Sequence, residues 1–542
     1  MGARITFLIV CFSVFYAFLI FNIYNLQVTK SEFYQAQAES INRLAGFLTP
    51  YRGEIYFTDK DGSRIPAAIN KEYPAIFIVP EEVENPAEAA EFLASISGRD
   101  EVELLNILNK SDDPYEPIVK RATEAQIELV NQADIKGIKI GSDHSRFYPL
   151  GAVAAHLLGF TSVDVENPGG RYGLEAYQEE QLGGEAGFTN GDRLSRAEPG
   201  QDLYLTIDRN IQVQAENTLE KLITDYGAQG GTVMVADPRT GKILAMSSYP
   251  DFDPNNYGQF PVANFLNPAV QAVYEPGSIF KVITMASALD AGKITPNTTF
   301  YDSGSLTLNG KTIKNWDLKA HGTVTMTNVI EKSINTGAAF AERALGNQNF
   351  YNYLVKFGLK EKTEIDLPSE IIGSLLPLEE DQREINFATA SFGQGISMTP
   401  IQLLTAISAI ANHGVMMKPY VDAREEPEEI GRVVSEDASR KVVGMMVSAV
   451  NKAEIARIPG YNVAGKTGTA QVPNFATGGY TDEVINTYVG FAPAYDPEFI
   501  IMIKMNKPAG APLAGLTVVP AFRELAEFVI NYYNIPPDNI GQ

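Results

Sequence analysis

A long, mostly apolar run lies close to the start of the chain. From Ile5 to Tyr24 no side chain carries a charge, and a helix of that length, rising about 1.5 Å per residue, spans about 30 Å, the thickness of a bilayer's hydrocarbon core. The run predicts a single membrane-spanning helix over residues 5–24. A cleaved signal peptide is the alternative, but its small-residue cleavage site should follow the run closely, and Ala36-Gln37-Ala38 lies too far beyond it.

Charge beside this run sets the expected orientation. Arg4 is the only charged side chain before it, so residues 1–4 are predicted to form a short cytoplasmic tail, with the bulk of the chain outside the plasma (inner) membrane. Cys11, the only cysteine, falls inside the run. The external part is therefore predicted to contain neither a disulfide nor thiol chemistry.

Mixed patterns over residues 25–200 indicate a separate α/β module. Residues 54–57 alternate between polar and apolar and lead into a turn signal at 59–62, whereas residues 84–135 are acidic with a helical pattern. Glycine, aspartate and proline gather at 190–192 and 198–200, which marks a domain boundary. No catalytic cluster stands out, so the module is interpreted as a non-catalytic pedestal.

Strand patterns at both ends, with helical patterns between them, define residues 201–542. The predicted strands are 203–208, 232–236, 242–246, 486–491 and 499–505, and an amphipathic helix is predicted over 209–223. Turn residues separate strand 232–236 from strand 242–246, and strand 486–491 from strand 499–505, so each pair is predicted to form an antiparallel hairpin. This arrangement predicts an α+β domain with an antiparallel sheet flanked by helices.

A serine and a lysine three residues apart supply the first candidate chemistry. Pro276 and Gly277 form a turn signal, and the apolar pattern after them predicts a helix that begins at Ser278. Ser278 and Lys281 would then share a face, where the amine could deprotonate the hydroxyl. A capping serine followed by a solvated lysine is the alternative interpretation.

Two further motifs follow in the order that acyl-transfer chemistry requires. Ser333-Ile334-Asn335 is a Ser-x-Asn, although Ser40-Ile41-Asn42 also matches that pattern, and Lys466-Thr467-Gly468 is a Lys-Thr-Gly. Residues 460–467 also fit the phosphate-binding P-loop pattern, but that motif must open a helix. Residues 468–473 are poorly suited to a helix, which argues against the P-loop.

Composition excludes other classes of function. A net charge of −23 argues against a nucleic-acid partner, because phosphate binding needs clustered Lys and Arg. The four histidines, His144, His156, His321 and His413, show no ligand spacing, so no metal and no cofactor is predicted. Trp316, the only tryptophan, is expected in the core or at a pocket rim.

On these motifs the chain resembles the class B penicillin-binding proteins over nearly its whole length. The resemblance rests on the anchor, on residues 52–55 and 173–175 in the module, and on all three catalytic motifs. Residues 357–359, 366–368 and 391–395 are similar to the division-type (FtsI-like) branch, as is Asn335, where elongation-type members often carry Asp. Residues 57–60 depart from the family pattern, which commonly shows Asp-Arg-Asn there.

The resemblance implies a fold and a role for each motif residue. It implies a penicillin-binding, serine β-lactamase-like transpeptidase domain over 201–542 and a dimerisation-like pedestal over 25–200. Ser278 would attack a D-alanyl-D-alanine stem peptide, with Lys281 as base, Ser333 as proton relay and Asn335 holding the substrate backbone. Lys466 would supply positive charge.

The Lys-Thr-Gly strand carries the remaining implied roles. The hydroxyls of Thr467 and Thr469 would bind the substrate carboxylate, and Gly468 would let the backbone approach it. By resemblance, the backbone N–H groups of Ser278 and Thr469 form the oxyanion hole.

The expected function is therefore a peptidoglycan D,D-transpeptidase of septal cell-wall synthesis, with β-lactams as covalent inhibitors. An elongation-type transpeptidase, a D,D-carboxypeptidase or β-lactamase, and a β-lactam-binding sensor would use the same acylation step, and a structural subunit would not need it. The sequence does not identify the acyl acceptor. The resemblance also implies partners, namely a membrane glycosyltransferase of the shape, elongation and division class and other divisome proteins.

Overall fold

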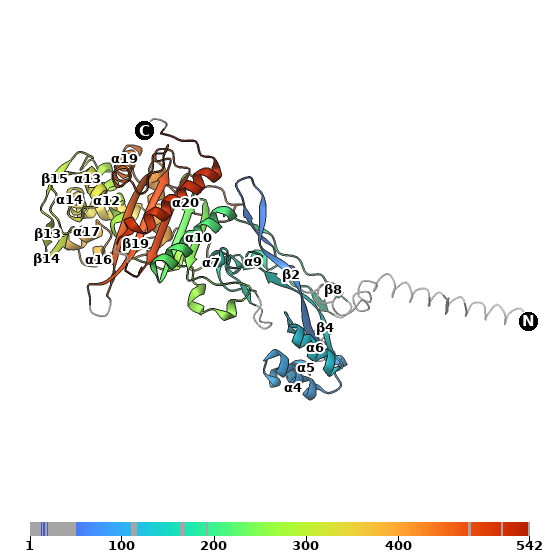
Figure 1. The fold of residues 1–542 in the computed structure, drawn as a ribbon. Helices are drawn as coiled ribbons and strands as arrows, with labels where there is room; N and C mark the ends of the chain where they lie inside the picture. The colour runs from blue at the N-terminus through green and yellow to red at the C-terminus, as the bar shows by residue number, and fades with distance from the viewer. Residues whose placement is uncertain are drawn as a thin grey trace, which may run out of the picture.

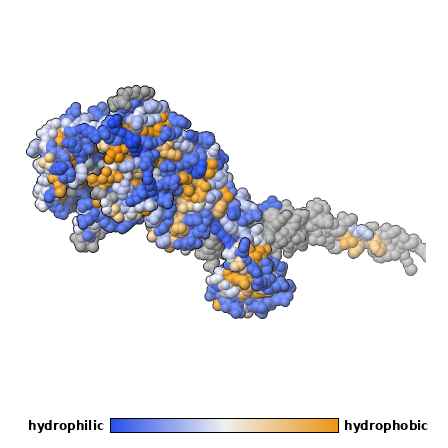
Figure 2. All heavy atoms as spheres, viewed as in Figure 1, coloured by the Kyte–Doolittle hydropathy of each residue, from blue (hydrophilic) through white to orange (hydrophobic). Residues whose placement is uncertain are grey.

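The computed structural model describes residues 12, 15, 16, 19, 50–109, 116–162, 169–190, 193–474, 478–510 and 513–539. An elongated N-terminal module leads into a larger C-terminal domain (Figure 1). The predicted tail and membrane span lie outside the described residues, apart from four helical positions. Within the residues that are described, no helix is long and apolar enough to cross a membrane. The surface facing the viewer is mostly hydrophilic on both parts (Figure 2).

A long strand, β2 (Arg64–Ile78), is the spine of the N-terminal module. It pairs antiparallel with β1 (Ile55–Thr58), β3 (Glu116–Val119) and β4 (Ile138–Phe147), and β1 pairs in parallel with β9 (Leu203–Tyr204). Gly62, with a φ of 81°, completes the turn between β1 and β2 and donates its N–H to the Asp59 carbonyl. The strand and turn predicted over 54–62 are confirmed.

Three helices cover the far end of β2 and β4. They are α4 (Pro86–Ser97), α5 (Glu101–Leu108) and α6 (Glu124–Ala133). The Asp100 carboxylate caps α5, and Thr123 and Gln126 form a capping box on α6. Apolar residues of these helices pack on Ile76 and Ile78 in a separate small core. The helical pattern over 84–135 is confirmed, with β3 as an interruption.

Short elements join the spine to the C-terminal domain. They are α7 (Ala155–Leu158), β5 (Thr161–Ser162), β6 (Gly169–Gly170), α8 (Gly173–Tyr177), α9 (Glu179–Leu182), β7 (Phe188–Asn190) and β8 (Arg193–Ser195). Glu175 on α8 is fully buried and accepts from Nε of Arg52 at 2.6 Å and Nε of Arg146 at 2.5 Å. Burial alone would raise the pKa of Glu175, but the two guanidinium groups outweigh burial and lower it.

The C-terminal domain is built on a five-stranded antiparallel sheet. Its order is β11 (Ile243–Tyr249), β10 (Gly230–Ala236), β20 (Phe499–Asn506), β19 (Tyr480–Ala492) and β18 (Ala464–Pro473). Both predicted strand pairs are confirmed. Strand 203–208 is shorter than predicted, because Leu205 bridges to Asp422 and Asp208 caps the following helix.

Alternate residues of the sheet enter two different cores. Val233 and Val235 pack with α10 (Arg209–Tyr226) and α20 (Val518–Tyr533), which cover one face of the sheet (Figure 1). Met234 and Ala236 enter the larger core on the opposite face. This period of two is what a sheet covered on both faces requires.

Helices and short hairpins form the layer on that opposite face. The helices are α11 (Pro268–Gln271), α12 (Lys281–Asp290), α13 (Met326–Lys332), α14 (Asn335–Leu345), α15 (Asn347–Lys356), α16 (Leu376–Glu380), α17 (Glu384–Ala390), α18 (Pro400–Ala411) and α19 (Glu436–Ala453). The paired short strands are β12 (Thr299–Asp302) with β15 (Gly322–Thr325), β13 (Ser305–Leu308) with β14 (Lys311–Lys314), and β16 (Val415–Met417) with β17 (Glu429–Arg432). The domain is α+β, as predicted.

Candidate active site

Ser278 lies in a single 3₁₀ turn, η5 (Gly277–Phe280), and Lys281 opens α12 directly after it. The sequence predicted an α-helical start at Ser278. The difference favours the chemistry, because residues i and i+3 eclipse in a 3₁₀ turn. Nζ of Lys281 lies 2.9 Å from Oγ of Ser278.

The backbone of Gly393 holds this turn in place by approaching it so closely that only glycine fits. Gly277 has a φ of 60° and donates its N–H to the Gly393 carbonyl at 3.0 Å. A Cβ on Gly393 would lie 2.3 Å from the Gly277 carbonyl oxygen, well inside van der Waals contact. Residues 391–395, noted in the sequence for their resemblance, therefore support the turn that carries Ser278.

Lys281 is fully buried and is surrounded by oxygen atoms. Besides Ser278, its Nζ lies 2.7 Å from the carbonyl oxygen of Ser333, 3.1 Å from Oγ of Ser333 and 2.8 Å from Oδ1 of Asn335. Burial, together with the positive charge of Lys466, lowers the pKa of Lys281 well below its ordinary value. A neutral amine beside a serine hydroxyl can accept that hydroxyl's proton.

Ser333 joins the two lysines of the site. It follows the last residue of α13 in the left-handed conformation, with a φ of 56°, a backbone state that is uncommon for residues other than glycine. Its Oγ lies 3.1 Å from Nζ of Lys281 and 3.0 Å from Nζ of Lys466. Burial lowers the pKa of Lys466 to about 7.

Asn335 begins α14 and bridges the lysine to the neighbouring hairpin. Its Nδ2 donates to the Lys314 carbonyl at 2.9 Å while its Oδ1 faces Lys281. The amide is thereby held in one orientation. Trp316 is 56% exposed and donates its indole N–H to the Lys332 carbonyl at 3.0 Å, so it lies beside Ser333 and not in the core.

Asp302 supports this part of the site and was not singled out in the sequence. It is fully buried and accepts hydrogen bonds from Thr336 Oγ1 at 2.7 Å and Asn315 Nδ2 at 2.8 Å, and from the backbone N–H groups of Gly304 and His321. Burial opposes ionisation of Asp302, but these hydrogen bonds outweigh it and lower its pKa. The Asp-x-Gly sequence, a turn signal, was the only hint.

Strand β18 carries Lys466, Thr467, Gly468 and Thr469 along the edge of the sheet, against η5. A Cβ on Gly468 would lie 3.0 Å from the Pro276 carbonyl oxygen and 3.1 Å from Cγ1 of Ile279. Glycine therefore permits the close approach of this strand to the nucleophile turn. The P-loop alternative is wrong, because Lys466 lies inside a strand and opens no helix.

All eight predicted site residues thus belong to one assembly of η5, α12, the α13–α14 junction and β18. A serine beside a buried lysine, bridged by a second serine to a second lysine, defines a serine acyl-transferase of the kind that forms a covalent acyl-enzyme. No group of three or more His, Cys, Asp or Glu side chains that could hold a metal occurs among the described residues.

Comparison with known proteins identifies the family. Residues 231–527 match the penicillin-binding protein transpeptidase domain, and residues 47–201 match the penicillin-binding protein dimerisation domain. The chain belongs to the class B penicillin-binding proteins, and it is a serine D,D-transpeptidase of peptidoglycan synthesis that acts on stem peptides and binds β-lactams.

Relatives in several bacteria match most of the chain. Stage V sporulation protein D of Bacillus subtilis is 33% identical over 501 residues, covering 86% of this chain and 76% of that protein. Peptidoglycan D,D-transpeptidase FtsI of Escherichia coli is 28% identical, covering 97% and 91%. The crystal structure of penicillin-binding protein 3 of Mycobacterium tuberculosis with aztreonam superposes with a TM-score of 0.69 at 26% identity, covering 91% and 99%.

Proposed function

We propose that this transpeptidase cross-links peptidoglycan at the division septum. The single observation that carries the chemistry is the position of Lys281 Nζ, 2.9 Å from the Ser278 hydroxyl in a fully buried environment. The septal role is supported by the division-type motifs and by Asn335 in the second catalytic motif. Elongation-type synthesis is the second candidate, because the relatives that match the chain include a sporulation protein as well as FtsI and do not share one cellular role.

Acylation begins when neutral Lys281 takes the proton of Ser278. The Ser278 oxygen then attacks the carbonyl between the two terminal D-alanines, and the backbone N–H groups of Ser278 and Thr469 stabilise the oxyanion, a contribution of about 10²–10³ in rate for each donor. Ser333 passes its proton to the departing D-alanine nitrogen and takes the proton that Lys281 removed from Ser278, so that Lys281 is neutral again. An ester on Ser278 forms as the peptide bond breaks.

Substrate contacts come from the strand and from α14. Lys466 and the hydroxyls of Thr467 and Thr469 bind the terminal carboxylate, and the Asn335 amide holds the substrate backbone. Burial is the larger cause of the lowered pKa of Lys281, and the positive charge of Lys466 adds to it. The amine of a neighbouring stem peptide then attacks the ester, which restores the Ser278 hydroxyl. Water in place of that amine gives the carboxypeptidase or β-lactamase alternative.

The whole chain is divided into four parts under this proposal. Residues 1–4 are a cytoplasmic tail, 5–24 the membrane anchor, 25–200 the pedestal and 201–542 the catalytic domain outside the cytoplasm. A membrane glycosyltransferase of the shape, elongation and division class contacts the anchor and pedestal. Exchange of residues 5–24 for an unrelated anchor should abolish co-purification of that glycosyltransferase, and unchanged co-purification would contradict the assignment.

Depletion of the protein tests the septal role. Loss of septal cross-linking should block division while elongation continues, giving filaments that retain their width. Complementation with Ser278→Ala should fail to restore septa although the protein is produced and folded. Rounded or widened cells in place of filaments would favour the elongation-type alternative.

A further inference from the structure

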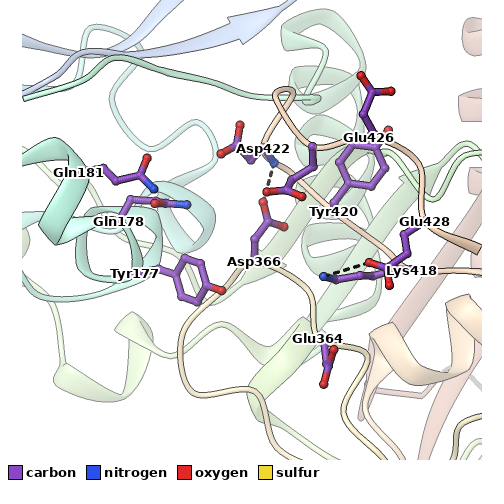
Figure 3. Close-up of a pocket in the computed structure, with 11 residues that line it drawn as sticks. Tyr177, Gln178, Gln181, Glu364, Asp366, Lys418, Tyr420, Asp422, Glu426 and Glu428 are labelled. Carbon is purple, nitrogen blue, oxygen red and sulfur yellow. Dashed lines mark hydrogen bonds and ion pairs between the residues drawn. The ribbon is translucent and has the colours of Figure 1, made fainter. Parts of the chain in front are cut away.

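A polar pocket of about 270 Å³ opens between the N-terminal module and the C-terminal domain, outside the catalytic assembly. Figure 3 shows Tyr177, Gln178 and Gln181 on one side of it, facing Asp366 and Asp422 on the other. Six carboxylates line the C-terminal side: Glu364, Asp366, Asp422, Glu425, Glu426 and Glu428. The catalytic mechanism uses none of them.

The pocket lies on a seam where the two parts are hydrogen-bonded together. Strand β9 belongs to the C-terminal domain but pairs with β1 of the N-terminal module. The Ala423 N–H donates to the Tyr204 carbonyl of β9 at 2.7 Å, and the Thr206 N–H donates to the Val421 carbonyl at 2.8 Å. Nη2 of Arg424 also donates to Oε1 of Gln181 on α9 at 2.9 Å. A ligand in the pocket would therefore touch both sides of the joint between the modules.

The pocket contains fewer cations than are needed to neutralise its six carboxylates. Lys418 pairs with Glu428 at 3.6 Å, and Arg424 pairs with Asp422 at 2.6 Å. In the described part of the chain, these are the only cations in ion pairs with the six carboxylates. Asp366 accepts the N–H groups of Val421 and Asp422, yet burial still raises its pKa. Two cations therefore face six carboxylates, and four of these carboxylates have no ion-pair partner among the described residues.

Tyr420 gives independent evidence for a ligand. It lines the same pocket, is only 3% exposed, and its hydroxyl has no hydrogen-bond partner in the structure. Buried hydroxyl groups are nearly always hydrogen-bonded, because an unmet one costs free energy. An entering donor group would satisfy this oxygen together with the carboxylates.

A metal ion fits these observations poorly. No three acidic, histidine or cysteine side chains converge closely enough to hold a metal among the described residues. The volume of about 270 Å³ is also far more than a single bare ion needs. A guanidinium or ammonium group on a flexible stem carries several N–H donors and fills such a space.

We infer that this pocket receives a lysine or arginine side chain of a partner polypeptide, held by the carboxylates and by the Tyr420 hydroxyl. The inference goes beyond the transpeptidase reaction and does not depend on the septal assignment. Because the side chain would contact both modules, partner binding would stiffen the seam between pedestal and catalytic domain.

Fluorescence anisotropy with a labelled tri-arginine peptide tests the proposal on the full chain in a zwitterionic detergent. Glu425→Gln with Glu426→Gln should weaken binding by about 10-fold or more, and both side chains are exposed, so the fold should survive. The matched control is Glu91→Gln with Glu128→Gln, an equal change in charge at exposed sites on α4 and α6, which should leave affinity within about 2-fold.

Tyr420→Phe provides a second test, because it should change thermal stability and peptide affinity in opposite directions. Removal of an unpartnered buried hydroxyl should raise the melting temperature without peptide, yet weaken peptide binding by about 3-fold. Equal weakening by the pocket and control pairs would overturn the proposal in favour of general attraction to an acidic protein. Displacement of the peptide from the wild type by Mg²⁺ or Ca²⁺ at about 1 mM would overturn it in favour of a metal site.

Discussion

At the scale of single residues, the site brings together two buried lysines, to which the proposed mechanism assigns different tasks. Lys281 contacts Ser278, both oxygens of Ser333 and the Asn335 amide, and its charged form is disfavoured. Lys466 contacts Ser333 and the Thr467 carbonyl from the strand. In the proposed mechanism, Lys281 acts as the base and Lys466 binds the substrate carboxylate.

The pKa of Lys466 predicts the pH dependence of ligand capture. Burial lowers this pKa to about 7, so Lys466 is charged below that pH and loses its proton above it. If the charge binds the ligand carboxylate, the second-order rate of acylation by an anionic β-lactam should fall by about 10-fold between pH 6 and 8. Stopped-flow acylation measured across this range provides the check.

Two controls isolate the charge on Lys466. Lys466→Arg keeps the charge at every pH, so its lower rate should show no such fall. A β-lactam with an esterified carboxylate should likewise show no fall with the wild type. A flat profile for the anionic drug with wild-type protein would contradict the proposed role of Lys466.

At the scale of elements, helix α14 carries both a residue of the candidate site and a buried carboxyl group. Asn335 begins the helix, and two turns later Glu342 is fully buried with neither carboxyl oxygen hydrogen-bonded. Burial raises the pKa of Glu342 to about 8, with a further contribution from Glu384 that Arg343 opposes. The folded protein therefore holds this side chain as a neutral acid at pH 7.

Glu342 should make the protein less stable as the pH rises. Its pKa is higher in the folded state than in the unfolded chain, so the folded state binds the extra proton between pH 4.5 and 8, and stability declines across that window. The shift in the pKa of Glu342 corresponds to a loss of at most roughly 5 kcal/mol in the free energy of unfolding. Glu342→Leu should raise the free energy of unfolding at pH 8 by about 1–3 kcal/mol, measured by urea denaturation.

The pH dependence distinguishes this effect from ordinary core packing. Glu342→Leu should gain more stability at pH 8 than at pH 5, because the wild-type acid is already neutral at the lower pH. An equal gain at both pH values would mean that Glu342 is not held neutral. Acylation of Ser278 should remain in the variant, since the Glu342 carboxyl makes no hydrogen bond to any catalytic group among the described residues.

Local sequence patterns predicted most of the helices and strands, because these elements are determined largely by residues close together in the sequence. The hairpin of β10 and β11, the strands β19 and β20, and α10 all follow from periodicity and turn signals. Three catalytic motifs were also readable, since each consists of consecutive or nearly consecutive residues. The sequence could not show that Lys281 and Lys466 meet at one serine.

Features that depend on tertiary proximity were missed. Asp302 acts through Thr336 and Asn315, which are far from it in sequence. The 3₁₀ turn at Ser278 depends on Gly393, which lies over 100 residues away. Glu342 lies on α14, which packs against α12, α13, α15 and α17, and a helical pattern alone does not reveal which of its positions these neighbours bury.

At the scale of the whole molecule, the pedestal is organised around Glu175. It joins Arg52 and Arg146, and Arg146 also donates to the Gly53 carbonyl at 2.7 Å. Tyr148 is linked to Asn255 of the C-terminal domain by two hydrogen bonds and approaches Glu175 at 3.3 Å. The ion cluster therefore lies where the pedestal meets the catalytic domain.

Glu175→Gln should destabilise the pedestal and spare the chemistry. Arg146 would lose its counter-charge and Arg52 would keep only the more exposed Glu179, which costs about 3–5 kcal/mol, and denaturant unfolding should show an earlier transition. The Ser278 site is built from C-terminal elements, so β-lactam acylation should persist before that transition. Glu524→Gln, which breaks an exposed pair with Lys221, is the matched control and should leave the transition unchanged.

Intact-mass spectrometry with a β-lactam tests the central claim most directly. Residues 25–542 incubated with the drug should gain one long-lived covalent adduct, and the Ser278→Ala protein, shown to be folded, should gain none. Long life is expected because a transpeptidase passes its acyl group to an amine in preference to water. An adduct that persists in Ser278→Ala, or a folded wild-type protein that forms no adduct, would contradict the account.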